Sequence, residues 1–185
     1  MFRTLANKIT LSRIILIPLI LILLLLPYLW AAWAALFFFA IAGITDWFDG
    51  YLARRDNQVS RIGQFLDPIA DKLLVSAILL LLVYNGRIEG LSVFPALIIL
   101  LREVAVSGLR EFLAELRISV PVSKLAKWKT AIQIFALGFL IVGTENAPDW
   151  IPATVIGDIL LWIAGGFTVI TGYDYWRASQ KHFEN

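Results

Sequence analysis

The sequence predicts an all-α, polytopic membrane protein with six transmembrane helices and a short N-terminal interfacial helix. Of its 185 residues, 59% are hydrophobic and only 16% are charged, which is far from the composition of a soluble domain. Several apolar runs also reach the roughly 20 residues that a helix needs to cross a bilayer. Because no internal repeat or low-complexity tract interrupts the pattern, we expect residues 1–185 to form a single domain.

The apolar runs give the predicted spans in order along the chain. Residues 1–10 precede them and are expected to form the interfacial helix. Arg3 and Lys8 before the first run imitate a secretory signal peptide, but a second long apolar segment follows at once, so we expect this helix to be retained. The predicted spans are residues 11–26, 30–53, 65–84, 91–112, 125–143 and 151–176.

The positive charges predict the orientation of these spans. Most Lys and Arg residues fall at the N-terminus, after the second and fourth spans, and at the C-terminus, whereas the opposite loops carry only Arg87. The positive-inside rule then places both termini in the cytoplasm. The absence of cysteine and the position of the only histidine, His182, in the polar tail argue against thiolate or histidine chemistry.

Four aspartates interrupt the apolar pattern on the predicted cytoplasmic side. Ionised aspartates are costly at membrane depth and normally face a cation or a wet cavity. Their spacing of three and four residues puts each pair on one helix face. Such oxygen ligands favour a hard divalent metal, Mg²⁺ or Mn²⁺. The motif reads D-x2-D-G-x2-A-R-x8-G-x3-D-x3-D, with its fixed positions at Asp46, Asp49, Gly50, Ala53, Arg54, Gly63, Asp67 and Asp71.

This motif resembles the signature of the CDP-alcohol phosphotransferase family, and all eight fixed positions match. The flanking segments T-D-W-F-D-G-Y-L-A-R-R, F-L-D-P-I-A-D-K and K-W-K-T are similar to those of its bacterial phosphatidylglycerophosphate synthases. The resemblance implies a membrane-bound, metal-dependent homodimer with no nucleic-acid partner. It also implies transfer of a phosphatidyl group from CDP-diacylglycerol to sn-glycerol 3-phosphate, which yields phosphatidylglycerophosphate and CMP.

The resemblance also implies roles for individual residues. Asp46, Asp49, Asp67 and Asp71 would bind two metal ions, and Asp71 would also be the catalytic general base. Asp67 before Pro68 could instead be only a helix N-cap, but a cap explains this one residue and not the spacing of the whole motif. The implied contacts to CDP-diacylglycerol are Gly50, Ala53, Arg54, Ser60 and Gly63, with Asn7 and Thr10 at the start of the first helix. Its acyl chains are expected in a groove beside the second and third spans.

A phosphorylated acceptor needs cations beside the metal site, and the fourth and fifth spans supply four. These are Arg102, Arg110, Lys127 and Lys129. Arg102 is the most informative, because it falls deep in an apolar run where a spare charge is expensive. The alternative is that the arginines pair with Glu103, Glu111 or Glu115 and that the lysines only anchor the membrane interface.

Three other functions stay open at this point. Two keep the chemistry and change the acceptor, to phosphatidylglycerol in a cardiolipin synthase or to inositol phosphate in a phosphatidylinositol phosphate synthase. The third is a divalent-cation transporter whose aspartates line a path. Its weakness is that all four aspartates of the motif lie on the predicted cytoplasmic side.

Overall fold

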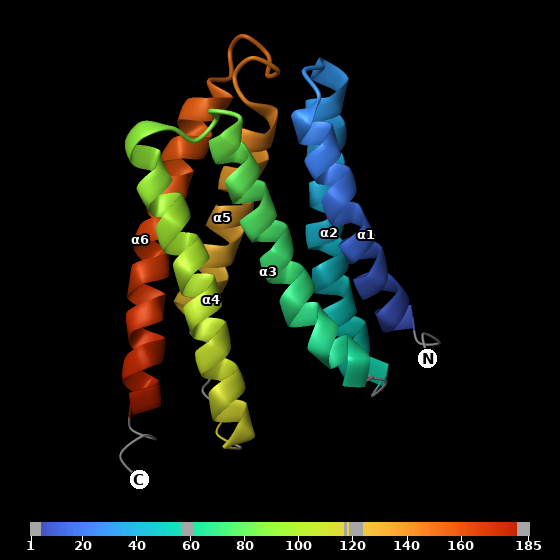
Figure 1. Cartoon of the computed structure of the whole chain (residues 1–185), viewed down its shortest axis with the longest axis vertical. Coiled ribbons are helices and arrows are strands. Elements are labelled where there is room, and N and C mark those ends of the chain that lie inside the picture. Colours follow the sequence, from blue (N-terminus) through green and yellow to red (C-terminus); the bar gives the residue numbers. More distant parts are fainter. Residues whose placement is uncertain (1–4, 57–60, 117, 119–123, 181–185) are drawn as a thin grey trace.

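The part of the chain that the structure describes folds as a bundle of six α-helices (Figure 1). The structure, a computed structural model, describes the backbone of residues 5–56, 61–116, 118 and 124–180, and the side chains of residues 13–45, 69–70, 72–116, 118 and 125–180. No strand occurs in these ranges, as the sequence predicts. The elements are α1 (Leu5–Leu25), α2 (Leu29–Asp56), α3 (Arg61–Tyr84), the 3₁₀ turn η1 (Gly90–Ser92), α4 (Val93–Glu115), α5 (Lys124–Val142) and α6 (Ala153–Gln180).

Successive helices run in opposite directions between the two ends of the bundle, so both described chain ends lie on one side (Figure 1). We call this side the motif end; there α2 ends at Asp56, α3 begins at Arg61 and α5 begins at Lys124. The opposite side, the far end, contains the turns at residues 26–28, 85–92 and 143–152. The eight positions of the aspartate motif therefore belong to two helices that meet the same side of the bundle.

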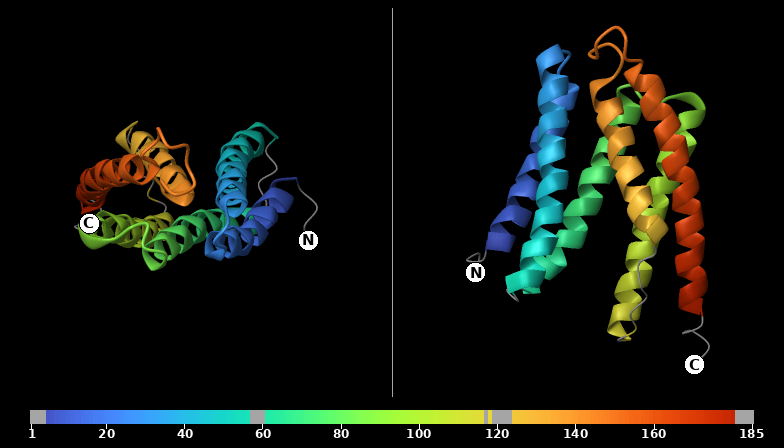
Figure 2. Two further views of the ribbon diagram at one scale, coloured as in Figure 1. Left: turned by 90° about the horizontal axis from the view of Figure 1, so that it is seen from above. Right: turned by 180° about the vertical axis from the view of Figure 1, so that it is seen from behind.

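The helices pack as two groups joined through α2 and α3. Helix α1 lies against α2 and α3, while α6 packs most extensively against α5 and also against α4. Contacts of α2 with α5 and of α3 with α4 connect the groups, and the views in Figure 2 show both groups side by side. One continuous apolar core runs through the bundle and includes the fully buried Ile20, Ile78, Ile99, Leu137 and Leu161.

Helix α6 approaches its neighbours closely because it presents glycines to them. A Cβ atom on Gly157 would come 2.7 Å from Cγ of Leu140, and one on Gly165 would come 2.8 Å from Cβ of Pro95. Small residues at helix contacts are typical of membrane bundles, where close backbone approach replaces the hydrophobic driving force. The position of α6 beside the polar residues of α4 and α5 depends on this close packing.

The number of apolar spans differs from the predicted six. In the described part of the chain, three stretches are long and apolar enough to cross a membrane: Gly90–Glu115, Leu125–Val142 and Ala153–Gln180. The apolar stretches described in the other helices are shorter, at Arg13–Leu25, Leu29–Thr45 and Lys72–Tyr84. In the sequence of α2 and α3, the polar residues of the aspartate motif interrupt stretches that the prediction counted within its spans.

The prediction of a separate interfacial helix at the N-terminus is also wrong, as far as the structure describes these residues. Residues 5–10 continue without a break into α1, which runs from Leu5 to Leu25. Pro18 lies inside this helix. The physical reason is that no turn signal separates residues 5–10 from the apolar run, so helix formation simply propagates through them.

Candidate functional site

The two halves of the aspartate motif lie at matching heights in the bundle. At a rise of 1.5 Å per residue, Asp46 and Asp71 both lie about 15 Å inside the ends of α2 and α3 at the motif end. Asp49 and Asp67 both lie about 10 Å inside the same ends. The backbone therefore brings the four aspartate positions to two common levels.

The remaining motif positions follow the same helices. Gly50, Ala53 and Arg54 lie in the last two turns of α2, and Gly63 lies in the first turn of α3. Their side chains, and those of the four aspartates, are outside the part that the structure describes. Further predicted contacts have the same status: Asn7 and Thr10 belong to α1 but their side chains are not described, and Ser60 lies outside the described residues.

A buried ionic cluster connects α4 to α5, about one helical turn from the level of Asp46 and Asp71. The carboxylate of Glu103 on α4 accepts a hydrogen bond from the ammonium of Lys129 on α5 and one of 3.3 Å from the guanidinium of Arg102. Only 4% of the Lys129 side chain and 17% of the Arg102 and Glu103 side chains are exposed. Two cations thus contact one carboxylate in a place largely shielded from water.

Arg102 also reaches across to α6. Its second amino group donates a hydrogen bond of 3.4 Å to the hydroxyl of Thr171. A Cβ atom on Gly172 would lie 3.3 Å from Cγ of Arg102, so glycine leaves the room that the arginine stem occupies. Its buried Nε has no hydrogen-bond partner among the described residues. The pairing with Glu103 matches the structural alternative raised for Arg102, but this N–H stays free for an anion.

A second polar contact joins this region to the aspartate motif. Lys72, the residue after Asp71 on α3, donates a hydrogen bond to the hydroxyl of Ser107 on α4. Ser107 lies one helical turn from Glu103, toward the motif end. The Glu103–Lys129 pair therefore lies within about one turn of the level of Asp71.

The other predicted basic residues have different surroundings. Lys127 is exposed on α5. Arg110 is also exposed, and its guanidinium lies 5.8 Å from the ring centre of Tyr175 on α6, as in a cation–π contact. Arg13 on α1, three residues after Thr10, is 3% exposed. Of the four cations predicted to contact the acceptor, the structure brings only Arg102 and Lys129 together.

Sequence reasoning did not assign a role to two buried residues here. Glu103 was considered only as a structural partner of the arginines, and Gln133 was not singled out. Gln133 lies four residues after Lys129 on α5, and only 4% of it is exposed. The available signal was the spacing, because residues four apart share a helix face.

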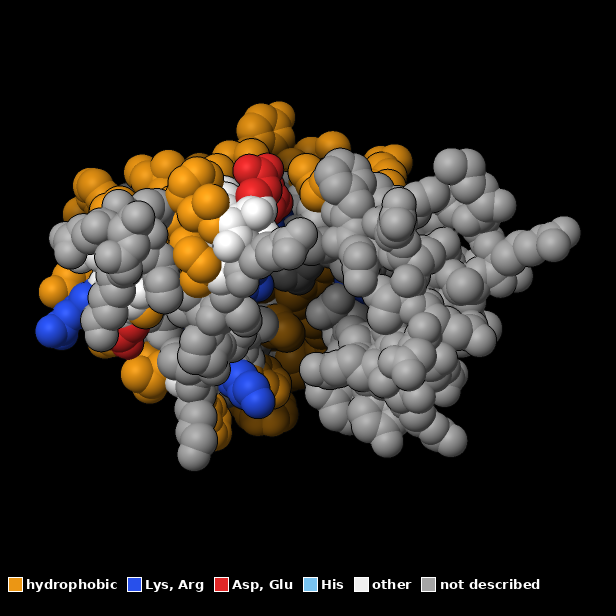
Figure 3. All heavy atoms as spheres, turned by 90° about the horizontal axis from the view of Figure 1, so that it is seen from below, with side chains coloured by type: hydrophobic (Ala, Val, Ile, Leu, Met, Phe, Trp, Pro, Cys, Tyr) orange, Lys and Arg blue, Asp and Glu red, His pale blue; other side chains and the backbone are white. Residues whose placement is uncertain are grey.

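Seen from the motif end, the surface is hollowed near its middle, and hydrophobic and Lys or Arg side chains are visible inside (Figure 3).

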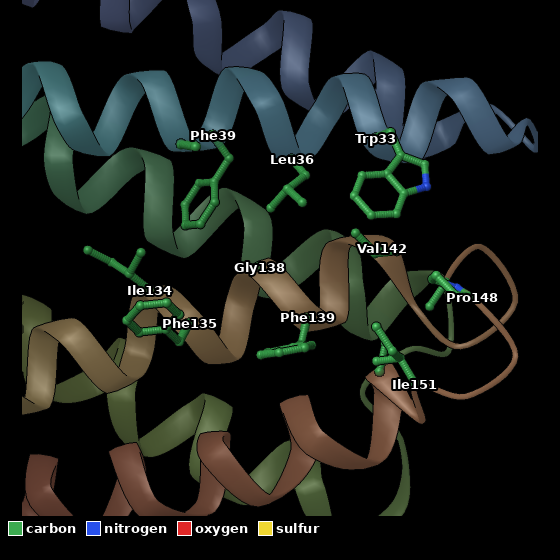
Figure 4. A pocket seen from close by; sticks show the side chains of 13 residues that line it. Trp33, Leu36, Phe39, Ile134, Phe135, Gly138, Phe139, Val142, Pro148 and Ile151 are labelled. Atoms are coloured by element: carbon green, nitrogen blue, oxygen red, sulfur yellow. The ribbon is translucent and has the colours of Figure 1, made fainter.

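An apolar pocket of about 330 Å³ lies on the other side of α5, between α2 and α5 (Figure 4). Trp33, Leu36 and Phe39 from α2 face Phe135 and Phe139 from α5 across it. The Trp33 ring nitrogen donates a 3.1 Å hydrogen bond to the carbonyl of Asn146 in the far-end loop. The lining of this pocket is apolar, so it suits a hydrocarbon chain better than a polar ligand.

The residue types in this region, acidic on α2 and α3 and basic on α4 and α5, suit a polyanion bound with a cation. The aspartates suit a hard divalent cation, which in turn suits a diphosphate. The Arg102–Glu103–Lys129 cluster suits a second, smaller anion beside it. Among the residues with described side chains, no other group of three acidic or histidine residues could hold a metal.

Comparison with known proteins identifies the family. Residues 3–170 match the model of the CDP-alcohol phosphatidyltransferase family. The chain is 44% identical to a CDP-diacylglycerol–glycerol-3-phosphate 3-phosphatidyltransferase of Rickettsia felis, over 98% of both chains. Proteins with the same name in Pseudomonas fluorescens and Bacillus subtilis are each 42% identical, over 96% and 92% of this chain and 91% and 92% of their own. The chain therefore belongs to the CDP-alcohol phosphatidyltransferase family.

Proposed function

We propose that this protein transfers the phosphatidyl group of CDP-diacylglycerol to sn-glycerol 3-phosphate, giving phosphatidylglycerophosphate and CMP. The observation that carries the proposal is similarity along almost the whole chain to enzymes named for these two substrates. The complete aspartate motif and the buried basic cluster support it independently of those names. The protein would thus act in phospholipid biosynthesis.

The aspartates of α2 and α3 would hold the metal ions. Asp46, Asp49, Asp67 and Asp71 are hard oxygen donors at two matched levels, so they fit two Mg²⁺ or Mn²⁺ ions. Bound there, the metal would neutralise the diphosphate and stabilise the departing CMP. Asp71 would take the proton from the attacking primary hydroxyl of the acceptor. Because the motif offers no obvious covalent nucleophile, a single in-line displacement at the β-phosphorus fits best.

The donor would lie along α2. Gly50 and Ala53 would let the nucleotide approach the helix closely, and Arg54 would pair with phosphate, with Gly63, Ser60, Asn7 and Thr10 completing the pocket. An acyl chain would extend toward the pocket between α2 and α5, whose lining is apolar. The acyl groove expected beside the second and third spans is thus proposed on the α5 side of α2.

The acceptor phosphate would bind at the Arg102–Glu103–Lys129 cluster. Arg102 retains an N–H without a partner in the described residues, and the Lys129 ammonium has three donors to distribute. Arg110 and Lys127, both exposed, would attract the acceptor as it enters. We further propose a multi-pass homodimer in the inner membrane of a bacterial cell, with both termini and the active site on the cytoplasmic side.

The test is CMP release by the purified full-length protein in detergent. CDP-diacylglycerol and Mg²⁺ are supplied with and without glycerol 3-phosphate. Release that requires both the metal and glycerol 3-phosphate is the expected result. Release only with phosphatidylglycerol or inositol phosphate would keep the chemistry and change the acceptor. No release with any acceptor by folded protein, together with metal flux into proteoliposomes, would favour the transporter.

A further inference from the structure

Trp33 lies at the far end of the apolar pocket between α2 and α5. Its ring lines the pocket (Figure 4), and its Nε1 donates the 3.1 Å hydrogen bond to the carbonyl of Asn146 in the far-end loop. Ala147 and Pro148 of the same loop also line the pocket. A bulky ring that is fixed to the loop therefore bounds the pocket on the side away from the aspartate motif.

Toward the motif end, the pocket face of α2 continues to the proposed nucleotide site. Leu36 and Ala40, which line the pocket, share this face with Gly43, Gly50 and Arg54, because successive members are separated by three, four or seven residues. A Cβ atom on Gly43 would meet no described atom within 4 Å, so there is open space beside the helix at this position. A lipid bound by its nucleotide at Gly50 and Arg54 would meet the pocket along this face.

The distance along α2 fits one acyl chain. At a rise of 1.5 Å per residue, Trp33 lies about 20 Å from the level of Asp46 along the helix axis. The hydrocarbon core of a bilayer is about 30 Å thick, so one chain of a membrane phospholipid reaches about 15 Å into it. Because the glycerol backbone separates the phosphate from the chain, the end of such a chain would lie close to Trp33.

We propose that Trp33 is a specificity-determining residue that limits the length of the acyl chain accepted in the lipid donor. This inference rests on the proposed function and adds to it a boundary for the substrate. A chain that ends before Trp33 fills the pocket without strain, whereas a longer chain must bend away from the ring or displace it.

The alternative is that Trp33, which is half-exposed, only anchors the far end of α2 at the membrane interface. An interfacial anchor affects the stability of the bundle and does not distinguish donors by chain length. A comparison of donors therefore separates the two roles.

The experiment is a competition between two donors in the same detergent micelles. The purified full-length protein receives equal amounts of CDP-diacylglycerol with hexadecanoyl chains and with the longer icosanoyl chains, together with Mg²⁺ and glycerol 3-phosphate. Mass spectrometry of the two products at low conversion gives the ratio of the kcat/KM values, because both donors compete for one site. We expect the wild type to prefer the shorter donor by about fivefold or more, and Trp33→Ala to lower this preference to about twofold or less.

Two further variants make the result specific. Trp30→Ala removes another tryptophan about one turn away on α2, which is not among the described lining residues, so it should keep the wild-type preference. Leu36→Trp places a ring about one turn nearer to the motif end and leaves the Trp33–Asn146 hydrogen bond in place. It should favour dodecanoyl over hexadecanoyl chains by about fivefold relative to the wild type, and it serves if Trp33→Ala does not fold.

The possible outcomes separate this inference from the proposed function. A wild type that uses both donors equally would overturn the role of Trp33 while leaving the transferase intact. A preference that stays unchanged in Trp33→Ala and Leu36→Trp would overturn it as well, and so would a loss in Trp30→Ala as large as that in Trp33→Ala. No product from either donor with folded wild type would instead overturn the proposed function, and this inference with it.

Discussion

The two ends of the bundle use polar residues in opposite ways. At the far end, Arg87 donates to the carbonyls of Leu140 and Ile141 in the last turn of α5 and pairs with Glu145 at 2.7 Å. Asn85 donates to the carbonyl of Leu24 at 2.8 Å. These groups satisfy backbone carbonyls that a helix end leaves open.

The motif end, in contrast, pairs its buried charges with one another. Glu103 binds Arg102 and Lys129, and the three side chains come from two helices rather than from a turn. Burying such charges costs more than apolar packing would, so stability alone does not explain them. The comparison shows that polar contacts at the far end hold the fold, whereas we propose that those at the motif end are arranged for a ligand.

The largest expected effect concerns the motif end itself. Asp71→Asn removes both the proposed base and a metal ligand, so turnover should fall by about 10³-fold or more. Binding of CDP-diacylglycerol, measured separately with radiolabelled lipid, should be largely retained because three aspartates remain. Substantial residual CMP release would exclude Asp71 as the essential base.

The next effect tests whether Glu103 positions the two cations. Glu103→Ala removes the carboxylate that pairs with the buried Lys129 ammonium and should destabilise the protein by about 3 kcal/mol. KM for glycerol 3-phosphate should rise about tenfold, with little change in KM for CDP-diacylglycerol. Glu103→Gln, which keeps an acceptor oxygen, should recover part of the loss, and the exposed Glu111→Ala should change neither quantity. Equal changes in the KM values of both substrates would show that Glu103 has only a structural role.

A smaller effect is expected at the far end. Arg87→Ala removes hydrogen bonds to the end of α5 and should lower the unfolding free energy by about 2 kcal/mol, visible as a lower melting temperature in detergent. Both KM values should stay within about twofold of the wild type, because the residue lies away from the ligand. A rise in acceptor KM as large as that of Glu103→Ala would contradict the proposed division between the two ends.

The smallest effect separates the inner cations from the outer ones. Arg110 is exposed over Tyr175, and its attraction for a phosphate is screened by water. Arg110→Ala should therefore raise KM for glycerol 3-phosphate about threefold, leave KM for CDP-diacylglycerol unchanged and lose this effect at high salt. Equal changes for both substrates would instead mark Arg110 as structural.

The sequence by itself determined the helical class, the membrane composition and the aspartate motif. Apolar runs of fixed length and a spacing of three or four residues are local properties, so they can be read without knowing how helices pack. The same reasoning placed Asp46, Asp49, Asp67 and Asp71 on one side of the bundle. The sequence reasoning overestimated the number of apolar spans, because average hydropathy does not show where polar residues interrupt an apolar stretch.

Only the tertiary structure decided which charged residues belong together. The sequence grouped Arg102, Arg110, Lys127 and Lys129 as cations for the acceptor, but the packing of α4 and α5 against α6 shields only Arg102 and Lys129 from solvent. It also brings Glu103 between them and leaves Gln133 one turn deeper with an unpaired oxygen. Such pairings depend on the rotation and height of neighbouring helices, which arise from contacts distant in sequence and from the close approach of α6.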